Sequence, residues 1–144
     1  MYQKITLRNG VRVVAERIDH VRSAAIGVWI GNGSRFESAE QNGISHFIEH
    51  MIFKGTEKRT ARHIASMMDA MGGQSNAFTT NDCPCFYMKV HDTHLHTAAE
   101  LLADMFLCSS FADEDIELER GVVLEEIDMY EDTPEDVATE KLFE

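Results

Sequence analysis

The chain has 144 residues, an apolar fraction of 44% and a formal net charge of −12 at pH 7. This length predicts a single domain, and the apolar content is sufficient for a sizeable core. The negative charge argues against nucleic acid as the main partner, because phosphates would be repelled.

The N-terminus and the cysteines indicate a compartment. The first residues lack both the apolar core of a signal peptide and the basic helix of a transit peptide. The longest apolar run, residues 24–30, is too short to cross a bilayer, so we expect no membrane partner. Three cysteines without framework spacing predict free thiols in a reducing compartment. We therefore expect a cytoplasmic protein or, alternatively, a mature chain in the mitochondrial matrix.

The first half of the chain is predicted to mix strands and helices. The predicted strands are residues 2–7, 11–16 and 23–30, and the predicted helices are residues 43–53 and 60–71. Asn9-Gly10 between two alternating runs is typical of a β-hairpin. The third strand is rich in Ala, Val and Ile, so we expect it to be buried. Thr60 is placed to cap the second helix, which Gly72 ends.

The second half continues the same mixture. Residues 74–79 and 85–90 are predicted strands, and residues 94–107, 113–130 and a segment from Pro134 are predicted helices. Hairpins without strict strand–helix alternation indicate an α+β fold, with helices packed on a mixed, largely antiparallel sheet. The last helix is still amphipathic at Leu142 and Phe143, and no stop signal precedes Glu144. This pattern predicts that the domain is truncated at its C-terminus.

A short motif in the first helix indicates the chemistry. His46, Glu49 and His50 lie at positions i, i+3 and i+4, which share one face of an α-helix. Two imidazoles that converge on one point suit a zinc ion, and a neighbouring carboxylate suits proton transfer. The order His-x-x-Glu-His is the inverzincin motif.

A catalytic zinc site usually has a third protein ligand, and the helix at 113–130 offers several glutamates. Glu119 and Glu126 are seven residues apart and therefore lie on one face of this helix, whereas Glu125 points elsewhere. Spacing alone leaves the choice between Glu125 and Glu126 open.

The segment around the motif, residues 43–56, resembles the signature of the pitrilysin/insulinase family of zinc metallopeptidases, and in particular its processing-peptidase branch. Three further segments resemble parts of that family. They are the loop before the motif helix (31–37), the substrate-binding edge strand (72–79) and the helix with the distal ligand (119–127). The resemblance covers essentially the whole chain in order.

The resemblance implies a role for each site residue. His46, His50 and Glu126 are expected to bind Zn²⁺, and Glu49 is expected to be the general base. Glu119 is expected to be an acid that orients the site. The resemblance also implies that Asn76, Ala77 and Phe78 pair with an extended peptide substrate by strand addition.

The resemblance further implies that residues 1–144 are the N-terminal zinc-bearing domain of a zinc metalloendopeptidase built as two closing halves. The partners would be a peptide, such as a basic or presequence-like one, and a C-terminal half-domain or second subunit. The isolated chain should cleave poorly. The alternative is a metal-binding or scaffold half that does not hydrolyse peptides. A second histidine group, His91, His94 and His96, has no convergent carboxylate beyond Asp92 and is expected to be a solvated loop.

Overall fold

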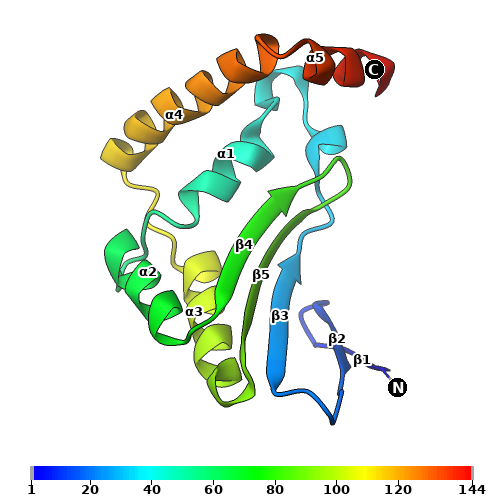
Figure 1. Cartoon of the computed structure of the whole chain (residues 1–144), viewed down its shortest axis with the longest axis vertical. Helices are drawn as coiled ribbons and strands as arrows, with labels where there is room; N and C mark the ends of the chain where they lie inside the picture. Colours follow the sequence, from blue (N-terminus) through cyan, green and yellow to red (C-terminus); the bar gives the residue numbers. More distant parts are fainter. Residues whose placement is uncertain (1, 144) are drawn as a thin grey trace.

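The computed structural model describes residues 2–143, apart from the side chains of residues 136, 140 and 143, and centres on a three-stranded antiparallel sheet (Figure 1). The strand order is β3 (Ser23–Trp29), β5 (Pro84–His91), β4 (Gln74–Thr79), so β5 is central and β4 has one open edge. The register aligns Ala77 of β4 with Phe86 of β5.

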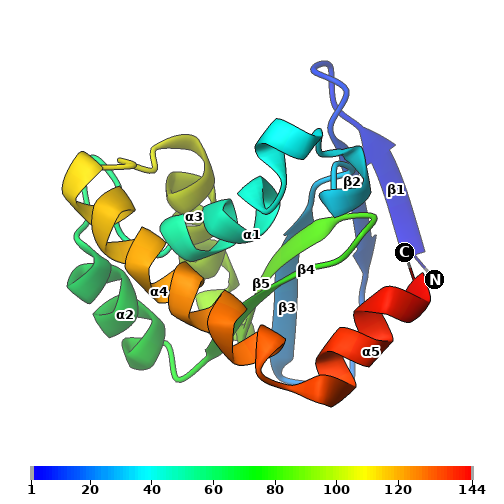
Figure 2. The same cartoon turned by 90° about the horizontal axis from the view of Figure 1, so that it is seen from above.

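The described part of the chain also contains five α-helices (Figures 1 and 2). They are α1 (Ile44–Met51), α2 (Ala61–Ala70), α3 (Leu95–Leu107), α4 (Asp113–Glu131) and α5 (Pro134–Phe143). Of three short 3₁₀ turns, Ser34–Phe36 and Ala39–Gln41 lie between β3 and α1, and Asp92–His94 lies between β5 and α3. Helix α3 packs on β3 and β5, whereas α1 lies between β4 and α4. None of the helices in the described part of the chain has the length and apolar character needed to cross a membrane.

The core lies between β5, α2 and α3. Side chains on one face of β5, at Phe86, Met88 and Val90, are at most 4% exposed. They meet an apolar stripe of α3 at helical spacing, which consists of Ala98, Leu101, Leu102 and Met105. Burial of each large side chain contributes about 2 kcal/mol, so this core holds the sheet in place under the site.

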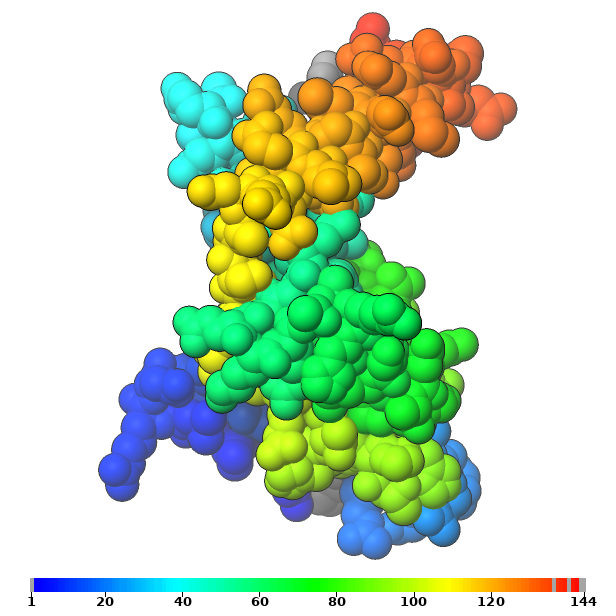
Figure 3. Space-filling model, turned by 90° about the vertical axis from the view of Figure 1, so that its left-hand side faces the viewer, coloured from blue at the N-terminus to red at the C-terminus, as the bar shows by residue number. Residues whose placement is uncertain are grey.

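The N-terminal hairpin forms a separate two-stranded ribbon of β1 (Tyr2–Thr6) and β2 (Arg12–Glu16). Gly10 adopts φ +89° and donates its N–H to the Leu7 carbonyl, so the Asn-Gly signal produces the expected turn. Every residue of both strands is exposed, and the blue ribbon projects from the body of the molecule in Figure 3.

The predicted α+β class is confirmed, and the predicted elements agree with the observed ones to within a few residues. Two details differ. All strand pairs among residues 2–143 are antiparallel and fall in two sheets, since the ribbon does not join the main sheet. The prediction that 23–30 is a buried strand is wrong, because β3 is an edge strand and only half-buried. The predicted roles of the Phe143 side chain and Glu144 lie outside the described residues.

Candidate metal centre

Helix α1 presents the motif, and Glu37 fixes where this helix begins. The two carboxylate oxygens of Glu37 accept the backbone N–H groups of Gly43 (2.7 Å) and Ser45 (2.8 Å). These donors have no partner within a helix, so the carboxylate caps the first turn. Desolvation acts to raise the pKa of Glu37, but the hydrogen bonds from Ser45 and Gly43 outweigh it and lower the pKa.

His46 and His50 project from one face of α1 toward Glu126 of α4. Their Nε2 atoms lie 3.1 Å apart. Glu126 Oε2 is 3.6 Å from His46 Nε2 and 3.4 Å from His50 Nε2. Tetrahedral zinc with bonds of about 2.0–2.1 Å places its ligand atoms about 3.3 Å apart. The two nitrogens and the carboxylate oxygen therefore fit a zinc ion in both spacing and chemistry.

Glu119 lies behind this triangle and orients His50. Its Oε1 lies 2.8 Å from His50 Nδ1, and its Oε2 forms an ion pair with Lys54 Nζ. The Glu119 side chain is almost fully buried. Burial acts to raise the pKa of Glu119, yet the hydrogen bonds and charges of Lys54 and His50 lower it overall. An ionised Glu119 accepts the Nδ1–H of His50 and so leaves the Nε2 lone pair directed at the candidate site.

Glu49 lies at the same face of α1, half-buried, with its carboxylate turned toward β4. Its Oε2 accepts a hydrogen bond from the Thr79 hydroxyl at 2.5 Å. A cavity of about 470 Å³ adjoins it, lined by Glu49, His50, Phe53, Lys54, Ala61, Ala65, Asn76, Ala77 and Glu119. The cavity gives a side chain of a bound molecule access to the space beside the motif.

The open edge of β4 faces the same region. The Ala77 N–H donates to Asn76 Oδ1 at 2.9 Å, which places this N–H at the free edge, since β5 occupies the other edge. The Phe78 side chain is 44% exposed and lies on the face of β4 opposite to the Ala77 side chain. A free strand edge with backbone donors is the usual receptor for an added strand.

The structure thus brings together five of the predicted residues, namely His46, Glu49, His50, Glu119 and Glu126. Asn76 and Ala77 line the adjoining cavity, while Phe78 is on the strand but does not line it. Glu125 is exposed and lies outside the group. Among the side chains that the structure describes, His46, His50 and Glu126 are the only group whose ligand atoms, within 4.8 Å of one another, could hold a metal ion.

The second histidine group does not converge on a point. His91 Nδ1 contacts Thr93 Oγ1 (2.9 Å) and Asp92 (3.0 Å), and the side chain of His96 is 86% exposed beside Glu100. These are local surface contacts.

The sequence patterns did not predict the roles of three residues that support the site. Lys54 was interpreted only as a cation at a helix end, and it lies beyond the last residue of α1, where helical spacing no longer predicts what it faces. Thr79 faces α1 because Ser75, Ala77 and Thr79 alternate along β4. Glu37 was placed in a loop, and no local sequence pattern connects it with a helix that begins seven residues later.

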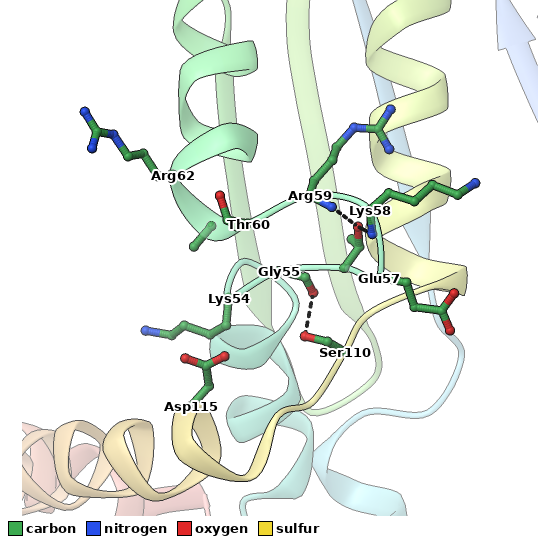
Figure 4. A pocket seen from close by; sticks show the side chains of 11 residues that line it. Lys54, Gly55, Glu57, Lys58, Arg59, Thr60, Arg62, Ser110 and Asp115 are labelled. Carbon is green, nitrogen blue, oxygen red and sulfur yellow. Dashed lines mark hydrogen bonds between the residues drawn. The ribbon is translucent and has the colours of Figure 1, made fainter.

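A second cavity, of about 500 Å³, lies beyond the end of α1 (Figure 4). Four cationic side chains line it, Lys54, Lys58, Arg59 and Arg62. Lys54 and Arg59 are paired with Glu119 and Asp104, respectively. Lys58 and Arg62 point away from each other in Figure 4, so the four charges do not converge on an anion.

Comparison with known proteins identifies the family. The model of the insulinase family, peptidase family M16, matches residues 12–144. A zinc protease of Bacillus subtilis is 53% identical over 99% of this chain and 35% of its own length. A probable mitochondrial-processing peptidase subunit beta of Arabidopsis thaliana is 42% identical over 95% of this chain and 26% of its own length.

A crystal structure of a protease from Helicobacter pylori superposes with a TM-score of 0.91 at 28% identity, covering 95% of this chain and 33% of that one. The chain therefore spans about a third of the length of the relatives that it matches. The shared sequence, the antiparallel fold and the motif agree: the chain belongs to the insulinase family of zinc proteases, peptidase family M16.

Proposed function

We propose that this chain is the zinc-bearing part of a metalloendopeptidase that hydrolyses extended peptides. The observation that carries the proposal is the convergence of His46 Nε2, His50 Nε2 and Glu126 Oε2, with a fourth residue, Glu49, on the same helix face. A purely structural metal site has no need of an additional carboxylate held beside it.

His46, His50 and Glu126 would hold the zinc ion, which when bound supplies Lewis-acid activation of water and of the scissile carbonyl. Glu49 accepts the proton of the attacking water on its carboxylate and delivers it to the leaving amine. Glu119 keeps the His50 ring in the tautomer that binds metal, and Lys54 maintains the negative charge of Glu119.

The peptide would lie along the open edge of β4 and pair with its backbone. Asn76 and Ala77 line the cavity beside Glu49 and His50, so a peptide paired with this strand would run past the candidate base. Main-chain pairing requires an extended substrate and places little demand on its sequence. The net charge of −12 favours basic or presequence-like peptides.

The working enzyme would also require a second half, either a C-terminal domain or another subunit. The side chains of His46 and Glu126 are 44% and 42% exposed. A site this open does not exclude water or enclose a peptide, and closure over the site is a common requirement of hydrolysis. The second half would complete the chamber.

Peptide cleavage by Glu49→Gln tests the proposal in a protein that contains this chain and extends to the length of its relatives. We expect the variant to retain zinc but to lose at least ~100-fold in kcat, because the base is gone. The isolated chain should cleave poorly, and a basic peptide should be cleaved better than a neutral one at low salt. Unchanged cleavage by Glu49→Gln with full zinc occupancy would contradict Glu49 as the base, whereas a parent protein that binds zinc but cleaves no peptide would favour the metal-binding scaffold.

A further inference from the structure

Thr79 connects the candidate base with the strand that would receive the peptide. It is the last residue of β4, and its hydroxyl donates to Glu49 Oε2 at 2.5 Å. Among the described residues it is the only hydrogen-bond partner of the Glu49 side chain. Both residues are partly buried, so water competes only weakly for this contact.

The position of the Thr79 backbone is fixed from both sides. Thr79 pairs with Pro84 of β5, and the next residue, Thr80, closes a tight turn by donating its backbone N–H to the Cys83 carbonyl at 3.2 Å. The Thr80 hydroxyl accepts the Cys83 N–H at 3.0 Å and donates to the Cys83 carbonyl at 2.9 Å. This turn leaves Thr79 little freedom, so its hydroxyl is preorganised toward α1.

A neighbouring loop holds this turn in place. Gly33 and Arg35 donate their backbone N–H groups to the Asp82 and Asn81 carbonyls, each at 3.1 Å. A Cβ at Gly33 would lie 2.4 Å from the Thr80 carbonyl oxygen, so only glycine permits this approach. The backbone that carries Thr79 is therefore braced by a third segment of the chain.

We propose that Thr79 is a positioning residue that holds the Glu49 carboxylate at a fixed place relative to a peptide paired with β4. This inference rests on the function proposed above. One oxygen, Oε2, is held by the hydroxyl, and the other, Oε1, is left to take the proton of the attacking water. Because Thr79 belongs to the strand that would bind the peptide, its hydrogen bond fixes the distance and orientation of the Glu49 carboxylate relative to the scissile bond.

Substitutions at Thr79 separate positioning from folding. Thr79→Val keeps the shape and the strand preference but removes the hydroxyl, whereas Thr79→Ser restores it. Thr93→Val is the matched control, because it removes the hydroxyl of another threonine, which contacts His91 and lies outside β4 and the candidate site. The assay measures kcat, KM and zinc content in a protein extended to the length of its relatives.

We expect Thr79→Val to lower kcat by roughly 10- to 100-fold with KM and zinc content close to the parent values, because a misplaced base slows only the chemical step. Thr79→Ser should recover most of the loss, and Thr93→Val should cleave like the parent. Parent-like cleavage by Thr79→Val, or equal losses in the Val and Ser variants, would overturn the inference while leaving the proposed function intact. A parent protein that binds zinc but cleaves no peptide would overturn both.

Discussion

The site region and the N-terminal ribbon represent two extremes of this chain. Around α1, buried and half-buried polar groups of α1, α4 and β4 are joined by hydrogen bonds, and Glu119 is only 4% exposed. In the ribbon, apolar side chains such as Ile5 (57%) and Val14 (63%) face outward. The site is thus organised by contacts between segments of the chain, whereas every residue of the two ribbon strands is exposed to solvent.

This difference predicts unequal sensitivity to substitution. A buried carboxylate that loses its cation keeps its desolvation cost, so changes near Glu119 should propagate to the whole fold. An exposed apolar side chain is already in contact with water in the folded state, so replacing it changes the free energy of unfolding little.

Lys54→Met should destabilise the chain by about 2 kcal/mol, because Glu119 would be left buried without its ion-pair partner. Ile5→Thr in the ribbon should change stability by less than about 0.5 kcal/mol. Urea unfolding followed by circular dichroism measures both. A ribbon variant that costs as much as Lys54→Met would remove the contrast between the regions.

Glu37→Gln should cost about 1 kcal/mol at pH 7, because a charged cap of α1 is replaced by a neutral one. The folded-state pKa of Glu37 lies below its ordinary value of 4.5, so its stabilisation is present above that value. It is lost as the pH falls through the folded-state pKa. The gap between parent and variant should therefore close in acid.

Thermal unfolding at pH values from 7 down to 3 measures this difference in stability between the parent and Glu37→Gln. Glu57→Gln, which removes an exposed carboxylate, controls for the change in net charge. A gap for Glu37→Gln that stays constant across this range would show that the carboxylate does not cap α1.

Much of the site was accessible from local patterns in the sequence. The His46–His50 spacing depends only on helix geometry, and the Asn9-Gly10 turn and the Thr60 cap are likewise local. Element types and their order followed from periodicity, because each helix and strand has its own apolar pattern.

What the sequence did not determine depends on contacts between distant segments. The choice between Glu125 and Glu126 depends on how α4 is rotated against α1, which packing decides. The partners Lys54–Glu119 and Thr79–Glu49 are 65 and 30 positions apart, and no local rule pairs them. The prediction that β3 is buried was wrong for the same reason, since its composition does not reveal that it lies at a sheet edge.

The most direct test of the metal centre is the zinc content of the purified chain and of two neighbouring variants. We expect about one zinc ion per chain for the parent and for Glu125→Gln, and zinc affinity lowered at least ~10-fold for Glu126→Gln, because only Glu126 reaches the two histidines. Loss of zinc from Glu125→Gln with retention in Glu126→Gln, or a parent chain that binds no zinc, would contradict the account.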